Sequence, residues 1–211
     1  MHQRVHHLRI GVCARRGRLH RVRAPRRPSG GAGMRTPHLL ASACTASDPE
    51  ARYHQAELAI WDELVLSLAK FPQTWRSPEE GAMVLGEEVD ELWDEIRGNR
   101  IGRARAEAAQ VGAMALRFIA DLYQPTGSAE IWYRTAADEQ HAVLASVGPQ
   151  DRPFSSSHEA FGFLKREYDA LWSAIRFDEP ARPFAARVAA MSVRFIAEIT
   201  AASTPVAVAV R

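Results

Sequence analysis

The chain contains two similar segments, and this internal repeat is the feature that most constrains its fold. Residues 77–97 align without a gap to residues 156–176, with identical residues at nine of the twenty-one positions. Residues 108–122 align to residues 185–199 with nine of fifteen positions identical, and the rare residues Trp, Met and Phe coincide. Because shared helix composition explains matching rare residues poorly, the pattern predicts two related helical hairpins packed together.

Apolar residues at helical spacing predict helices after about residue 47, and no run alternates apolar and polar residues as a strand would. Ser47 or Asp48 is the expected N-cap of a first long helix, with Pro49 in its first turn. Ser77 is the expected N-cap of a second helix, because Pro78 follows it at the first helical position. The predicted fold class is all-α, a helical bundle, and the helices expected after the first cover about residues 79–96, 103–122, 136–147, 157–176 and 181–201.

Charge is divided unevenly along the 211 residues. Residues 1–47 contain ten Arg and no acidic residue, so residues 48–211 carry seventeen basic and twenty-five acidic side chains. The basic segment is rich in Arg, Gly and Pro and has too little apolar sequence to offset the entropy of ordering, so we expect disorder. The expected organisation is a basic tail at 1–47, a single all-α domain at 48–202 with repeats at 77–122 and 156–199, and a C-terminal tail at 203–211.

The Arg-rich tail has two interpretations. The first is that the tail is an inert leader and Met34 is the true start, which fits the excess of Arg over Lys in the chain, 25 to two. The second is that it is a targeting peptide or an arm that binds nucleic-acid phosphates. We favour the first and do not expect nucleic-acid binding. No segment is apolar enough for a signal peptide or a membrane span, and Cys13 and Cys44 lack a CxxC partner. These observations predict a cytoplasmic protein that does not bind membranes.

Acidic side chains accompany the apolar stripes of the second and third expected helices. Glu88 and Glu91 lie beside the stripe of the second helix, and Glu107 and Gln110 each precede an apolar residue of the third by four positions. A carboxylate that faces a core is costly unless it is paired or bound to a metal, and residues 77–122 contain no Lys. Oxygen ligands of this kind favour Mg²⁺ or Mn²⁺. The alternative is that the acidic run is a solvated helix face.

The second repeat keeps the apolar frame but loses acidic residues. Ala170 stands at the position of Glu91, and Phe184 stands at the position of Glu107. Acids that served only solubility would be expected in similar numbers in both repeats. Their loss from one repeat favours a site in the first hairpin that the second hairpin supports.

These residues resemble the all-α nucleoside triphosphate pyrophosphatases of the MazG and dimeric dUTPase type. The signature of that family is ExxE on one helix and ExxD on the next. Here Glu88 and Glu91 match the first part, and Glu107 and Gln110 match the second with an amide as the last member. The resemblance covers residues 77–122, with a weaker echo in the second repeat. It implies Mg²⁺-dependent hydrolysis, with Mn²⁺ as a substitute, of a nucleoside triphosphate between its α and β phosphorus atoms.

The resemblance also implies roles for individual residues. Glu88, Glu91 and Glu107 are expected to bind the metal directly, and Gln110 to bind it or to position water. Glu87 is expected to act as a nearby catalytic base or as a carboxylate that supports the metal ligands from behind. Arg97, Arg100 and Arg103, between the two acidic helices, are expected to receive phosphates, or else form a solvated basic loop.

Three further expectations remain open. Trp75 and Trp93 either stack against a nucleotide base or belong to the core. A housecleaning role against damaged nucleotides, and assembly into a homo-oligomer, are further implications of the resemblance. The rival function is a catalytically inactive MazG-like protein that binds a nucleotide or another protein.

Overall fold

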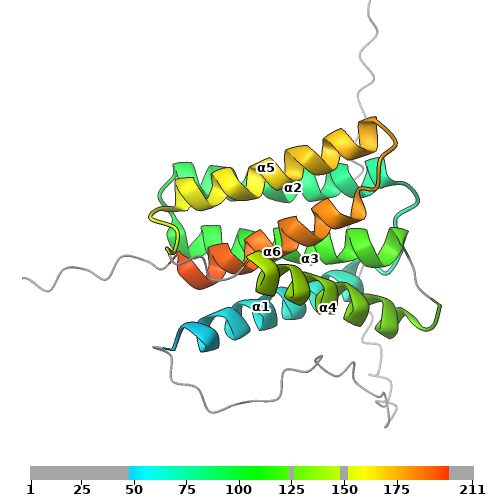
Figure 1. The fold of residues 1–211 in the computed structure, drawn as a ribbon, viewed down its shortest axis with the longest axis horizontal. Coiled ribbons are helices and arrows are strands. Elements are labelled where there is room, and N and C mark those ends of the chain that lie inside the picture. The colour runs from blue at the N-terminus through cyan, green and yellow to red at the C-terminus, as the bar shows by residue number, and fades with distance from the viewer. Residues whose placement is uncertain (1–47, 124–125, 148–151, 200–211) are drawn as a thin grey trace, which may run out of the picture. The chain divides into compact units, whose positions relative to one another are not determined.

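The computed structural model describes residues 48–123, 126–147 and 152–199, and these form six helices (Figure 1). The described residues contain no strand, so the all-α prediction is confirmed. The expected tails at 1–47 and 203–211 lie outside the described residues. The helices are α1 (Pro49–Lys70), α2 (Pro78–Arg97), α3 (Ile101–Leu122), α4 (Ala129–Val147), α5 (Ser157–Arg176) and α6 (Arg182–Glu198).

Side-chain caps start three of these helices. The carboxylate of Asp48 accepts a hydrogen bond from the backbone N–H of Glu50 at 3.0 Å and so caps α1. The hydroxyl of Ser77 accepts one from the N–H of Glu80 at 3.2 Å, and Ser156 caps α5 in the same way. Each bond satisfies a backbone donor that has no partner within the helix. The expected caps Asp48 and Ser77 are therefore confirmed.

Helix α4 begins earlier than the sequence pattern predicts. It starts at Ala129 rather than near residue 136, after the carbonyl of Ser128 accepts hydrogen bonds from the N–H groups of Ile131 and Trp132. Its first two turns contain adjacent bulky apolar residues that obscure the helical period. Helix α3 likewise begins at Ile101, two residues before its expected start.

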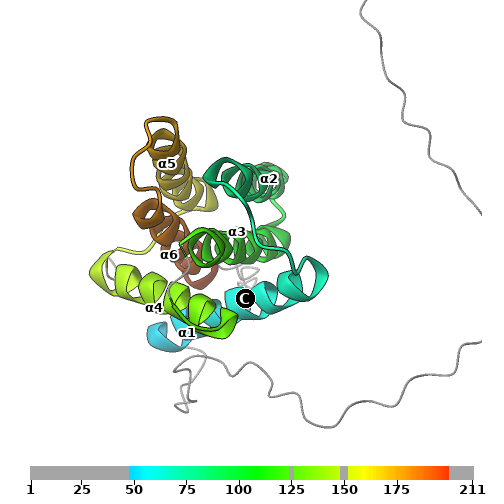
Figure 2. The ribbon, with the colours of Figure 1, turned by 90° about the vertical axis from the view of Figure 1, so that its right-hand side faces the viewer.

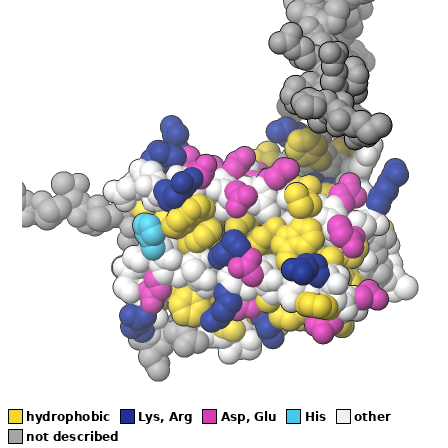
Figure 3. Space-filling view, turned by 90° about the horizontal axis from the view of Figure 1, so that it is seen from above, with side chains coloured by type: hydrophobic (Ala, Val, Ile, Leu, Met, Phe, Trp, Pro, Cys, Tyr) yellow, Lys and Arg dark blue, Asp and Glu magenta, His cyan; other side chains and the backbone are white. Residues whose placement is uncertain are grey.

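The helices form three layers of two (Figures 1 and 2). Helices α2 and α5 lie side by side in one outer layer, α3 and α6 form the middle layer, and α1 and α4 form the other outer layer. The middle helices are buried almost all round, α3 from Ala108 to Asp121 and α6 from Ala185 to Ala197. The only breaks in these two buried runs are Gln110 and Arg187. The surface formed by α2 and α5 carries hydrophobic side chains among acidic and basic ones (Figure 3).

Each middle helix contains a buried ion pair between residues four positions apart. In α3, the guanidinium of Arg117 lies 3.4 Å from the carboxylate of Asp121, and both side chains are at most 3% exposed. In α6, the guanidinium of Arg194 lies 2.7 Å from the carboxylate of Glu198. Arg194 and Glu198 each follow their counterpart by 77 residues, which is the spacing of the sequence repeat.

The same two carboxylates accept further corresponding hydrogen bonds. The hydroxyl of Tyr133 in α4 donates to Asp121, and the hydroxyl of Tyr53 in α1 donates to Glu198, each at 2.5 Å. The backbone N–H of Trp75 donates to Asp121, and that of Phe154 donates to Glu198. The corresponding contacts thus join α4 to α3 and α1 to α6, so they include two helices that lie outside the sequence repeat.

The turns that join α2 to α3 and α5 to α6 also correspond. Asn99 has a φ of 52° and Asp178 a φ of 55°, and the two residues are 79 positions apart. Asn and Asp adopt this left-handed region more readily than other residues with a side chain.

None of the described helices combines the length and apolar character needed to cross a membrane.

Candidate metal centre

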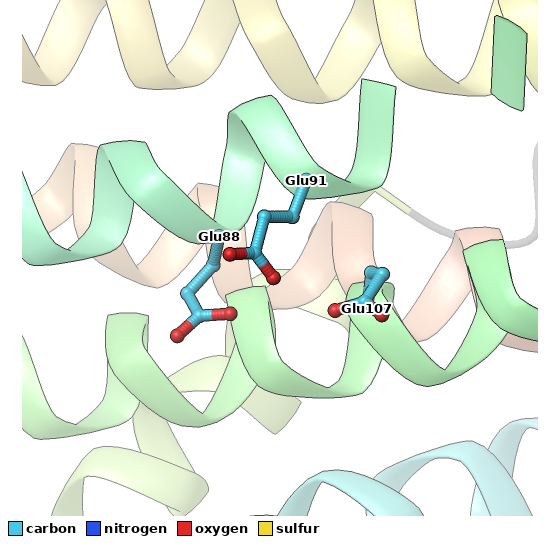
Figure 4. A group of neighbouring side chains, drawn as sticks. All are labelled: Glu88, Glu91 and Glu107. Carbon is cyan, nitrogen blue, oxygen red and sulfur yellow. The ribbon is translucent and has the colours of Figure 1, made fainter. Parts of the chain in front are cut away.

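Three carboxylates meet where α2 packs on α3 (Figure 4). Glu88 and Glu91 project from α2 toward α3, which carries Glu107, and each of the three offers an oxygen within 4.8 Å of the others. The buried residues Val89 and Leu92 fix the rotation of α2 against the core. This rotation places Glu88 and Glu91 at the edge of the helix contact, as the sequence pattern predicts.

Two members of the cluster line an open pocket of about 950 Å³ between α1, α2 and α3. Glu88 and Glu91 contribute to its wall, together with Gln110, and Glu107 lies beside them. Carboxylates outnumber basic groups on this wall. Its acidic residues are Glu63, Glu80, Glu87, Glu88 and Glu91, and its basic residues are Lys70, Arg76 and Arg117.

Burial and mutual repulsion raise the pKa values of two members of the cluster, Glu88 and Glu107. Burial, followed by the charges of Glu91, Glu107, Glu63 and Glu87, raises the pKa of Glu88 to about 7. Burial and then the charge of Glu91 also raise the pKa of Glu107. Within the described part of the chain, neither these two residues nor Glu91 forms an ion pair with a basic side chain. The pocket therefore holds negative charge that a cation would neutralise.

The metal-free protein is expected to become less stable as the pH rises from about 5 to about 8. The pKa of Glu88 is about 7 in the folded chain, whereas that of an unperturbed glutamate is 4.5. The folded state therefore binds this proton more tightly, and the stabilisation is complete below the lower value and lost as the pH rises through the higher one. Thermal unfolding in EDTA across this range measures the effect. Glu88→Gln should reduce the slope, and an unchanged slope would show that Glu88 is not its source.

The arrangement fits a hard divalent cation. Two oxygens that share one Mg²⁺ lie at most about 4.2 Å apart, because each lies about 2.1 Å from the ion. Carboxylate oxygens within 4.8 Å of one another therefore reach a common ion with small side-chain rotations. The side-chain amide of Gln110 donates to a carboxylate oxygen of Glu107. Gln110 thus orients a candidate ligand, and its position as a ligand in its own right remains a prediction.

The three arginines expected to receive phosphates lie at the turn between α2 and α3. Arg97 pairs with Asp94, and Arg100 pairs with Glu95. Like Arg103, they are exposed, and none of the three is among the described residues that line the pocket. Their guanidinium groups therefore lie outside the described pocket wall, and their role in receiving phosphates stays a prediction.

The two tryptophans occupy different environments. Trp75 lines the pocket, and the guanidinium carbon of Arg117 lies 5.1 Å from the centre of its ring. Trp93 is half-buried between α2 and α5, where its ring stacks on that of Phe161 with centroids 4.9 Å apart. Trp93 therefore belongs to the packing of the bundle, and only Trp75 is placed to contact a ligand in the pocket.

Helix α1 contributes a charge that sequence reasoning missed. Glu63 lines the pocket, and its charge raises the pKa values of both Glu88 and Glu107. Glu87, the expected catalytic base, is exposed on α2 and also lines the pocket. The signal for Glu63 was its place beside the buried residue Leu64, but only the packing of α1 on α3 reveals which cluster it joins.

Comparisons with known proteins give no further assignment. No protein-family model matches the chain, and searches of curated proteins and of solved structures found no match. Any function must therefore be argued from the residues and geometry of the pocket itself.

Proposed function

We propose that the protein is a Mg²⁺-dependent nucleoside triphosphate pyrophosphohydrolase of the all-α, MazG-like kind. The observation that carries the proposal is the meeting of Glu88, Glu91 and Glu107 at an open pocket without basic partners among the described residues. Carboxylates arranged in this way repel one another until a cation binds. Nucleoside triphosphates are the abundant substrates that arrive with Mg²⁺, and phosphoryl chemistry depends on neutralising their charge.

In this proposal each side chain of the pocket has a separate role in hydrolysis. Glu88, Glu91 and Glu107 would hold the cation, and the amide of Gln110 keeps the carboxylate of Glu107 oriented. A bound Mg²⁺, or Mn²⁺ in its place, would offset phosphate charge and lower the pKa of a water molecule. Glu87 accepts the proton of the attacking water as the anhydride between the α and β phosphorus atoms breaks. The products are a nucleoside monophosphate and pyrophosphate.

Basic residues near the acidic cluster supply the remaining charge for the phosphates. Lys70 and Arg76 line the same pocket, from the end of α1 and from the segment that leads to α2. Arg117 lines it too, but its guanidinium is already paired with Asp121 and donates to Ser67 and to the carbonyl of Gln73. In this proposal Lys70 and Arg76 contact the phosphates, which is the role that the resemblance implies for Arg97, Arg100 and Arg103.

A tandem duplication accounts for the two halves of the bundle. The sequence repeat supports it, and so do the corresponding ion pairs Arg117–Asp121 and Arg194–Glu198. The matching hydrogen bonds of Tyr53 and Tyr133 extend the correspondence to α1 and α4, each of which bonds the middle helix of the other half. One half then holds the acidic site, and the other completes the core.

Gln110 favours a second candidate function, nucleotide binding without hydrolysis. The amide carries no charge and donates its hydrogen bond to Glu107. A fourth carboxylate at this position would add negative charge for a second cation. A site with three carboxylates and an amide therefore suits a single ion, which is enough to bind a triphosphate.

Pyrophosphate release from a panel of canonical and modified nucleoside triphosphates tests the proposal. The full chain is expected to release pyrophosphate with Mg²⁺ or Mn²⁺ and to release none in EDTA. The variant Asp90→Asn, which changes an exposed carboxylate on the same helix, should keep the activity. A folded protein that binds triphosphates with Mg²⁺ but releases no pyrophosphate would favour the second function, and one that does neither would exclude both.

A further inference from the structure

A second pocket lies in the half of the bundle that lacks the carboxylate cluster. Its volume is about 390 Å³, within the range typical of small-molecule sites. Its walls come from α5, α6, the segment before α5 and the last residue of α4. Arg152, Arg166, Arg187 and Arg194 supply four guanidinium groups, and Phe154 and Phe163 supply aromatic surface.

Residues that line this pocket correspond, in the alignment of the repeats, to residues that line the pocket beside Glu88 and Glu91, here called the acidic pocket. By the alignment of the repeats, Arg166 stands at the position of Glu87, and Arg187 stands at the position of Gln110. Arg187 interrupts the buried run of α6, as Gln110 interrupts that of α3. At these two corresponding positions the second half therefore carries guanidinium groups, whereas the first half carries a carboxylate and an amide.

The ion pairs within the pocket leave positive charge uncompensated. One carboxylate of Glu167 lies 2.9 Å from the guanidinium of Arg166 and 3.9 Å from that of Arg187, so two cations share one anion. The side chains of Arg166 and Arg187 are 65% and 50% exposed, whereas that of Glu167 is 13% exposed. Exposed ion pairs contribute little stability, so these guanidinium groups can turn toward a ligand at small cost.

We propose that this second pocket binds a small organic phosphate without a metal ion. Arg166 and Arg187 hold the phosphate, because the planar guanidinium group matches phosphate oxygens with paired hydrogen bonds. The aromatic rings of Phe154 and Phe163, whose centroids are 5.4 Å apart, contact the apolar body of the ligand. The inference does not depend on the acidic pocket or on hydrolysis there.

Isothermal titration calorimetry of the full chain in EDTA tests the inference, with AMP, inorganic phosphate and adenosine as probes. AMP should bind, and both inorganic phosphate and adenosine should bind at least about tenfold more weakly. The double variant Arg166→Gln Arg187→Gln should lower the affinity for AMP by at least about tenfold. The variant Arg176→Gln, which removes an exposed arginine elsewhere on α5, should leave it unchanged.

Three results would overturn the inference. The first is that AMP fails to bind to the folded wild-type protein in EDTA. The second is that AMP binds equally well to the double variant, whose exposed positions tolerate glutamine and whose folding circular dichroism verifies. The third is that inorganic phosphate binds as tightly as AMP, which would exclude a role for the aromatic wall.

Discussion

Glu88→Gln is expected to lower the rate of pyrophosphate release about a thousandfold, which corresponds to about 4 kcal/mol of transition-state stabilisation. Glu88 is the member of the cluster whose pKa responds to the charges of Glu91 and Glu107 and also to those of Glu63 and Glu87. A neutral amide at this central position can neither neutralise the cation nor replace a charged ligand. The same change relieves repulsion, so the metal-free variant should be at least as stable as the wild type.

Two measurements separate loss of the site from loss of the fold. Steady-state pyrophosphate release gives the activity, and calorimetric titration with Mg²⁺ shows whether the ion still binds. Glu91→Gln should also abolish Mg²⁺ binding, whereas Asp90→Asn, one position away on the exposed side of α2, should preserve it. Mg²⁺ binding that survives in both Glu88→Gln and Glu91→Gln would remove these carboxylates from the metal site.

Asp121→Ala is expected to lower the free energy of unfolding by about 3–5 kcal/mol. The carboxylate of Asp121 is fully buried, faces Arg117 and accepts hydrogen bonds from Tyr133 and from the backbone of Trp75. Its removal leaves a buried guanidinium without its counter-ion, which is among the most destabilising changes in a protein core. Denaturant unfolding followed by circular dichroism measures the loss.

A double replacement tests the cause of this loss. Arg117→Met Asp121→Leu removes both charges and fills the space with apolar atoms, so it should be less destabilising than Asp121→Ala alone. Glu198→Ala, at the corresponding carboxylate in α6, should cost a similar amount because it leaves Arg194 without its partner. If the double variant were as unstable as the single one, packing and hydrogen bonding rather than the stranded charge would explain the effect.

The helices were largely predictable because capping residues and apolar spacing are visible in short stretches of the sequence. Ser77 and Asp48 cap helices where their side-chain oxygens predict caps, and the expected range of α5, residues 157–176, matches its observed bounds. The predicted start of α4 was wrong because adjacent aromatic and aliphatic residues mask the helical period there. The expected last residues of the sixth helix, 200 and 201, lie outside the described part of the chain.

The candidate site was predictable only where one helix face determines it. The register of Glu88 and Glu91 follows from the apolar stripe of α2, and Glu107 meets them because α3 packs against that stripe. Glu63 comes from a separate helix, and no local pattern indicates that α1 brings it to the same pocket. The prediction for Arg97 and Arg100 could not include their pairing with Asp94 and Glu95, because that depends on how the turn folds.

The two pockets belong to different stretches of one polypeptide, and this affects how each can change during evolution. In a dimer of identical subunits, one codon change alters both equivalent sites at once. Here a codon change at position 110 alters the acidic pocket alone, and one at position 187 alters only the second pocket. Selection can therefore act on the two sites independently while the shared core of α3 and α6 is maintained.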